Sequence, residues 1–204
     1  MMSALVFLPG ASGSQNFWKP LVRELAPEHY HILSYSGFDG TTPDIGIQNL
    51  TDLQHALEPK IPSGSILIAQ SMGGVLAMGM ALAPNSSVKA LILIATSGGL
   101  DTQALGCTDW RLDYRHQYQD VPDWFWKDQT HYSEEQLASI NIPVLLVWGS
   151  HDPLSTVQVG QYLGSIMHQA KLHIIEGGDH FLALNRAQDI APIIQNFIQE
   201  VGRS

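Results

Sequence analysis

Charged side chains are scarce in this sequence. Asp, Glu, Lys and Arg make up 14% of the 204 residues, against about a quarter in an ordinary globular chain. Ten basic residues stand against 19 acidic ones, which gives a formal net charge of −9, and Lys and Arg form no cluster. This balance argues against a nucleic-acid partner and against binding to an anionic membrane. The hydrophobic fraction of 45% instead predicts a single domain, residues 1–204, with a large core.

Cysteine and long apolar runs are also missing. Cys107 is the only cysteine, which excludes an internal disulfide and suits a reducing cytoplasm. No run approaches the roughly 18 apolar residues that a membrane helix needs. Pro9-Gly10 ends the N-terminal apolar run, and no basic segment precedes that run, so it does not match a signal peptide. We therefore expect a cytoplasmic protein with no membrane partner.

Metal and nucleotide motifs are absent as well. The sequence contains no His-Glu-x-x-His, no paired-cysteine zinc pattern, no phosphate-binding loop and no Gly-x-Gly-x-x-Gly. His29 and His31 would share one face by strand alternation, but no third ligand accompanies them at metal spacing. We interpret these histidines as ordinary edge residues and expect neither a metal nor another cofactor.

Short apolar runs alternate with helical patterns along most of the chain. Continuous Val/Ile/Leu-rich runs are typical of parallel strands covered on both faces, and they occur at residues 5–8, 31–34, 66–69, 90–95, 144–148 and 172–175. Helical patterns lie between and after them, at residues 17–25, 47–57, 73–83, 156–166 and 187–201. This alternation predicts a three-layer α/β fold, in which helices cover a mostly parallel sheet of about six strands.

One segment interrupts the alternation. Residues 98–141 show no strand pattern but contain seven of the chain's 17 aromatic residues, and so long an insertion is usually a lid or a binding element. Eight acidic residues against three basic ones give it a net charge of −5. We predict a short helical lid in which Trp124, Phe125 and Trp126 contact the substrate. Simple packing of these rings onto the sheet is the alternative.

The most specific motif lies at the end of the third predicted strand. Ala69-Gln70-Ser71-Met72-Gly73 places a serine between two small residues at a strand-to-helix turn. A turn of this kind is a nucleophile elbow, which holds the serine in a strained and exposed position. Because the start of a helix favours negative charge, the Met72 N–H is predicted to stabilise an oxyanion and Ser71 to act as the nucleophile.

With this elbow, the sequence resembles the α/β-hydrolase family over nearly its whole length. The resemblance implies a catalytic triad in the chain order nucleophile, acid, histidine, with each member following a different strand. The acid would be Asp152, in a Gly-x-x-Asp turn, and the base would be His180, after the last strand. Ser71 would attack a carbonyl carbon, His180 would take and return the proton, and Asp152 would hold the imidazole.

Other residues near these positions fit the resemblance less well. Asp101 follows a strand but lacks the turn signature, and Asp179 precedes the histidine, where ordering the loop is its simpler role. The resemblance implies a second oxyanion donor, the Ala11 N–H, in a loop where Pro9 replaces the family's usual histidine. Because the first predicted strand begins near residue 4, we expect a sheet without the family's early antiparallel strands.

The serine at the elbow selects a branch of the family, since its dehalogenases and epoxide hydrolases carry an aspartate there. The resemblance implies a serine hydrolase that cleaves a small ester or thioester through an acyl-enzyme, with lactones and amides as further options. The alternatives are a carrier-protein methyl-ester esterase and a protein with a lyase or ligand-binding role. An acidic lid repels anions, so we expect small neutral acyl substrates, unless Arg111 and Arg115 form a local anion clamp.

Overall fold

A computed structural model of the chain describes residues 3–109, 114–115 and 121–203. Its centre is a six-stranded sheet in the order β2-β1-β3-β4-β5-β6. The strands are β1 (Leu5–Leu8), β2 (Tyr30–Ile32), β3 (Ile66–Gln70), β4 (Ala90–Ile94), β5 (Val144–Gly149) and β6 (Ala170–Ile175). All neighbouring strands of this sheet pair in parallel. The predicted six-stranded sheet without early antiparallel strands is therefore confirmed for the described part of the chain.

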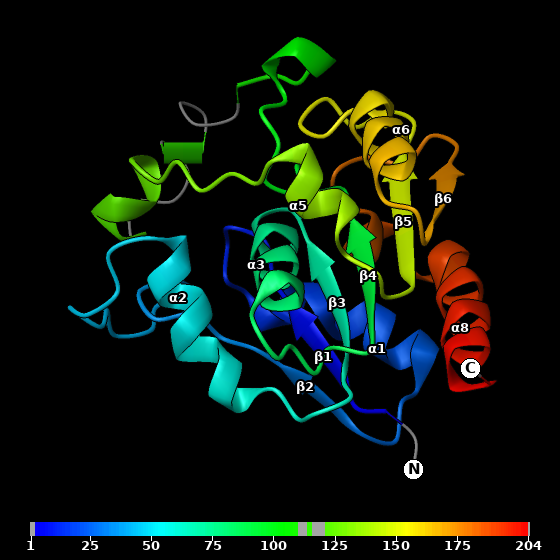
Figure 1. The fold of residues 1–204 in the computed structure, drawn as a ribbon, viewed down its shortest axis with the longest axis horizontal. Helices are drawn as coiled ribbons and strands as arrows, with labels where there is room; N and C mark the ends of the chain where they lie inside the picture. Colours follow the sequence, from blue (N-terminus) through cyan, green and yellow to red (C-terminus); the bar gives the residue numbers. More distant parts are fainter. Residues whose placement is uncertain (1–2, 110–113, 116–120, 204) are drawn as a thin grey trace.

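Helices cover both faces of the sheet (Figure 1). One layer contains α1 (Lys19–Leu25), α7 (Leu182–Asn185) and α8 (Ala187–Arg203), and the other contains α2 (Leu50–Leu57), α3 (Met72–Leu82), α5 (Glu134–Ala138) and α6 (Val157–Ile166). Short 3-10 turns are η1 (Gln15–Trp18), η2 (Glu58–Lys60), η3 (Gln103–Leu105) and η4 (Asp123–Trp126). All five predicted helices are present, and the first is divided into η1 and α1. None of the described helices combines the length and apolar character needed to cross a membrane.

The strands divide their side chains between two hydrophobic clusters. In β1, Val6 and Leu8 pack on the α3 side, whereas Leu5 and Phe7 pack on the α1 and α8 side, because successive strand residues point to opposite faces. The two edge strands depart from the expectation that all six are covered on both faces. Tyr30 in β2 is 45% exposed, and three of the six residues of β6 are exposed. The expectation was wrong for these strands, since the flanking helices leave the sheet's edges partly open.

The order of the strands creates a topological switch point at the carboxyl end of the sheet. β2 and β3 lie on opposite sides of β1, so the connections that follow β1 and β3 lead away in opposite directions. Ligands of open α/β sheets bind at such a switch point. The loop that carries Ala11 leaves β1, and the turn that carries Ser71 leaves β3. Both segments therefore lie at this switch point.

The segment between β4 and β5 contains η3, η4 and α5, and no strand lies in its described part. Figure 1 shows it, in green, above the carboxyl ends of the central strands, which is where the sequence predicts the lid. A capping box of Ser133 and Gln136 begins α5. Just before it, the Tyr132 hydroxyl donates to the Val75 carbonyl of α3 at 3.2 Å. This end of the segment is thus attached to the helix that follows the elbow.

Candidate active site

Ser71 lies in a strained turn between β3 and α3. Its backbone has φ 51° and ψ −121°, a region that costs a non-glycine residue about 1–3 kcal/mol and persists only where the surroundings hold it. The chain around β4 contacts both of its backbone polar groups. The Ser71 N–H donates to the Ile94 carbonyl at 3.1 Å, and Thr96 Oγ1 donates to the Ser71 carbonyl at 2.6 Å. The turn thus has the strained geometry expected of a nucleophile elbow.

Small residues allow this turn to pack directly against the loop after β1. A Cβ atom at Gly73 would lie 2.4 Å from the Leu8 carbonyl oxygen, which is closer than real Cβ contacts allow. A Cβ atom at Gly10 would lie 3.3 Å from the Ser71 Cβ. The segment that carries Ala11 is therefore adjacent to the serine.

The two predicted oxyanion donors flank Ser71 on different segments. Met72 begins α3, and the first N–H groups of a helix have no partner within the helix. Among the described residues, neither the Met72 nor the Ala11 N–H donates to another backbone group. The Tyr35 hydroxyl donates to the Pro9 carbonyl at 2.8 Å, and burial raises the pKa of Tyr35 well above its ordinary value. Tyr35 therefore remains a donor and orders a loop in which position 9 has no polar side chain.

Asp152 and His180 form a buried pair. The His180 Nδ1 and the Asp152 Oδ2 are 2.8 Å apart, and the Asp152 side chain is fully buried. The other carboxylate oxygen accepts the backbone N–H groups of Leu154 and Ser155, at 2.8 and 2.9 Å. Because these two donors hold Oδ1, Oδ2 is left to face the imidazole. A carboxylate accepts hydrogen bonds and cannot donate them, so the proton lies on Nδ1, and Nε2 can accept one.

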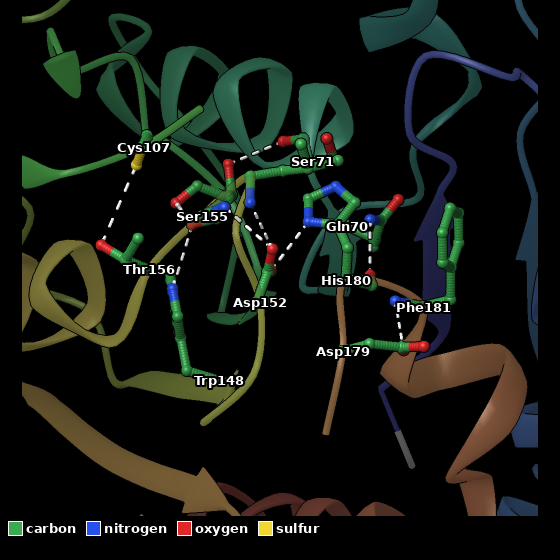
Figure 2. Close-up of polar contacts among 12 residues, drawn as sticks. Gln70, Ser71, Cys107, Trp148, Asp152, Ser155, Thr156, Asp179, His180 and Phe181 are labelled. Atoms are coloured by element: carbon green, nitrogen blue, oxygen red, sulfur yellow. Dashed lines mark hydrogen bonds and ion pairs between the residues drawn. The ribbon is translucent and has the colours of Figure 1, made fainter. Parts of the chain in front are cut away.

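The imidazole lies between the carboxylate and the serine. Figure 2 shows its Nε2 edge directed toward Ser71, and Gln70 Nε2 donates to the His180 carbonyl at 3.2 Å. Within the described residues, the His180 imidazole forms a hydrogen bond with Asp152. In this same part of the chain, it forms none with the Ser71 hydroxyl. Such contacts often tighten only when substrate binds. The structure thus brings the three predicted residues together at one edge of the sheet, with the Asp152–His180 contact formed.

The other candidate residues have different surroundings. Asp101 is exposed, and it is Asp152 that contacts the imidazole. Asp179 Oδ1 accepts the Phe181 N–H at 2.9 Å, and its Oδ2 accepts from Asn185 at 3.3 Å. Asp179 therefore makes the loop-ordering contacts expected of it.

The predicted substrate-contacting rings pack against the core. Trp124 and Phe125 are 9% and 7% exposed, and their ring centroids lie 5.9 and 5.6 Å from that of Phe38. Trp126 is half-buried, 5.2 Å from the Phe125 ring. These contacts match the packing alternative for Trp124 and Phe125, whereas contact with a substrate stays a prediction for all three. Phe38 itself packs against Gly13 in the loop after β1, so this cluster adjoins the site.

The described residues show no built site for a metal. Within residues 3–109, 114–115 and 121–203, no three His, Cys, Asp or Glu side chains are grouped as metal ligands.

The Arg115 guanidinium lies over the Trp126 ring, 5.8 Å from its centroid. Arg111, the other arginine of the predicted anion clamp, is outside the described residues.

Three buried polar residues at the site were missed by the sequence analysis. Gln70, Thr96 and Ser155 are 4%, 0% and 2% exposed. Gln70 and Thr96 donate to the backbone carbonyls of His180 and Ser71, and the Ser155 N–H donates to the Asp152 carboxylate. A signal for Thr96 was present, because a hydroxyl residue directly follows the apolar run of residues 90–95. Buried polar groups need partners, so a threonine at this position indicates a hydrogen bond at the end of the strand.

Comparisons with known proteins identify the family of this chain. A family model described as "Alpha/beta hydrolase family" matches residues 5–125, and one described as "alpha/beta hydrolase fold" matches residues 98–187. A pimeloyl-[acyl-carrier protein] methyl ester esterase from Yersinia pseudotuberculosis is 24% identical, over 96% of this chain and 93% of that protein.

Solved structures show the same fold. MenH from S. aureus has a TM-score of 0.80 at 18% identity, over 99% of this chain and 95% of that one. A lipase-esterase related protein from Clostridium acetobutylicum has a TM-score of 0.74 at 19% identity, over 96% and 94%. With more than half of its residues matched by a family model, the chain belongs to the alpha/beta hydrolase family.

Proposed function

We propose that this chain is a serine esterase, which cleaves a small ester or thioester through an acyl-enzyme on Ser71. The observation that carries the proposal is the buried Asp152–His180 pair, at the sheet edge where the strained Ser71 turn lies. A carboxylate that orients an imidazole beside a serine hydroxyl is the arrangement that activates a serine. The esterase name of the Yersinia relative supports the same reaction.

Each residue has a defined task in this mechanism. Ser71 Oγ attacks the carbonyl carbon of the substrate while His180 Nε2 accepts its proton, and Asp152 stabilises the imidazolium that forms. The Met72 and Ala11 N–H groups donate to the oxyanion, and one such donor contributes about 10²–10³ to the rate. His180 then protonates the leaving alcohol or thiol. A water molecule, activated by the same imidazole, releases the acid from Ser71.

A second candidate function is hydrolysis of a methyl ester carried on an acyl carrier protein, which the name of the Yersinia relative favours. The negative charge of the segment between β4 and β5 argues against this function. The described residues of that segment include six acidic residues and two basic residues, Arg115 and Lys127. Carrier proteins are typically acidic and would be repelled. We therefore favour small neutral substrates, and a cytoplasmic location that suits the single Cys107.

The decisive experiment combines covalent labelling with a substrate panel. A fluorophosphonate probe should add one phosphonyl group to the wild-type protein, located on Ser71 by mass spectrometry, and Ser71→Ala should remain unlabelled. Ser71→Ala and His180→Ala should also abolish hydrolysis of short neutral esters. Labelling and turnover that persist in Ser71→Ala would refute the serine mechanism. A folded wild-type protein with neither property would favour the lyase or ligand-binding role.

The same panel separates the two substrate classes. We expect p-nitrophenyl acetate, a short thioester and a free methyl ester to be hydrolysed with higher kcat/KM than a methyl ester on an acyl carrier protein. A clear preference for the carrier-bound ester would overturn the substrate assignment and leave the serine mechanism intact.

A further inference from the structure

A chain of buried hydrogen bonds runs behind the site, from the nucleophile turn to the acid (Figure 2). Thr96 Oγ1 donates to the Ser71 carbonyl at 2.6 Å, and Ser155 Oγ donates to the Thr96 carbonyl at 3.1 Å. Ser155 also donates its N–H to Asp152 Oδ1 at 2.9 Å. These contacts join segments that follow β3, β4 and β5. Of the residues that form these hydrogen bonds, Thr96, Ser155 and Asp152 are at most 4% exposed.

The direction of each hydrogen bond follows from counting donors. A hydroxyl has one proton, and Thr96 Oγ1 also accepts the Gly98 N–H at 3.0 Å, so its proton is free for the Ser71 carbonyl. In the same way, Ser155 Oγ accepts the Trp148 indole N–H at 3.0 Å and donates to the Thr96 carbonyl. Each hydroxyl therefore donates one hydrogen bond and accepts another, and it cannot rotate without losing a buried contact.

The space around Thr96 is also fitted to this contact. A Cβ atom at Gly74 would lie 2.3 Å from Thr96 Oγ1, so a larger residue there would displace the hydroxyl. Ala95, just before Thr96, has a φ of 47°, which turns the chain at the end of β4. The position of this hydroxyl is thus set by α3 and by the turn that follows β4.

We propose that Thr96 is a positioning residue that orients the Met72 N–H toward the oxyanion, with Ser155 joining it to the acid. The proposal rests on the proposed function. The Ser71 carbonyl and the Met72 N–H belong to the same peptide unit, which is planar, so they point in opposite directions along it. A hydrogen bond that fixes the carbonyl therefore also fixes the direction of the N–H. The Gly74 N–H donates to the same carbonyl at 2.9 Å, so removing Thr96 Oγ1 loosens the peptide without freeing it.

The kinetic consequence is specific to the chemical step. A tilted N–H donates less well to the oxyanion, which exists only in the transition state and the tetrahedral intermediate. Thr96→Val removes the hydroxyl at nearly constant shape. Since losing a whole oxyanion donor costs about 10²–10³ in kcat, we expect a partial loss of about 10–100-fold, with KM changed by less than about twofold.

A matched control separates positioning from stability. Ser65 is fully buried and donates its hydroxyl to the Pro62 carbonyl at 2.5 Å, but it precedes β3 at the opposite end from Ser71. Ser65→Ala should lower Tm and leave kcat unchanged, whereas Thr96→Val should lower both. Thr96→Ser, which keeps the hydroxyl, should restore kcat. Affinity for a trifluoromethyl ketone, which forms a tetrahedral adduct, should fall in Thr96→Val by the same factor as kcat/KM.

Three results would overturn the proposal: an unchanged kcat in Thr96→Val, an equal loss of kcat in Ser65→Ala, or failure of Thr96→Ser to restore activity. If Thr96→Val does not fold, Ser155→Ala decides the matter, since it should lower kcat at constant KM, and an unchanged kcat would refute the link. A Ser71→Ala protein as active as the wild type would instead refute the proposed function.

Discussion

Replacing Asp152 with asparagine gives the sharpest test of the triad, because the structure determines how the new side chain must sit. Oδ1 accepts two backbone N–H groups, from Leu154 and Ser155. An asparagine amide turned with its NH₂ toward these donors would oppose donor to donor. Its oxygen must therefore stay there, and its NH₂ must face His180 Nδ1, 2.8 Å from the present carboxylate oxygen. Nδ1 then becomes the acceptor, and the ring proton moves to Nε2.

The expected loss of activity is large and the expected loss of stability is small. An imidazole protonated at Nε2 cannot accept the Ser71 proton, and the same exchange in a serine protease lowers kcat about 10⁴-fold. We expect Asp152→Asn to lose about 10³–10⁴ in kcat for a neutral ester. The two backbone hydrogen bonds to the residue at position 152 survive, so Tm should change little.

The assay is kcat and KM on p-nitrophenyl acetate, together with thermal unfolding. Asp179→Asn is the control, because Asp179 adjoins the base but its carboxylate contacts Phe181 and Asn185 instead of the imidazole. It should lose far less activity. An Asp152→Asn enzyme within about tenfold of the wild type would refute the reasoning. If Asp101→Asn lost activity instead, the acid would be misassigned.

Three further predictions follow from other contacts. Gln70→Met removes the donor to the His180 carbonyl and should lower kcat about tenfold, whereas Gln54→Met, at another buried glutamine, should not. Burial, with the nearby Asp128 charge, raises the pKa of Tyr132 to about 12. The contribution of this tyrosine to the free energy of unfolding is complete below about pH 10, its ordinary pKa, and is lost as pH rises through 12. In Tyr132→Phe, the free energy of unfolding measured by urea titration should therefore fall less steeply over this pH range. Finally, a carboxylate-bearing ester should have a lower kcat/KM than a neutral analogue, and added salt should narrow the difference between the two. A preference for the anionic ester that weakens with added salt would contradict this and point to the anion clamp predicted for Arg111 and Arg115.

The fold was largely predictable because its signals are local. Each inner strand is an apolar run bounded by turns. This pattern predicts a strand whichever other strand it pairs with. The parallel topology follows from the alternation of strands and helices. The edges were less predictable, since the exposure of Tyr30 depends on which strand ends the sheet, and the apolar pattern carries no such information.

The candidate site was predictable where it rests on chain order and turn geometry. Ser71, Asp152 and His180 each follow a strand, and parallel strands place such residues at one edge of the sheet. The aromatic residues of the segment between β4 and β5 were harder to interpret. A Trp-Phe-Trp run signals burial, but only the packing on Phe38 shows that Trp124 and Phe125 turn toward the core.

The supporting hydrogen bonds lay beyond the sequence because they join distant positions through the register of the sheet. Thr96 and Ser71 are 25 residues apart, Ser155 and Thr96 are 59 apart, and Gln70 and His180 are 110 apart. Each joins a polar side chain to a backbone carbonyl, which any residue type supplies, so no side-chain pattern marks the partner. Loss of one side chain leaves a buried carbonyl without that partner, which costs stability as well as geometry. Mutations behind this site should therefore lower Tm and kcat together. A residue that positions the reacting groups is distinguished by its loss of kcat relative to its loss of Tm. This ratio should be larger than the ratio for a buried hydroxyl far from the nucleophile, which only stabilises the fold.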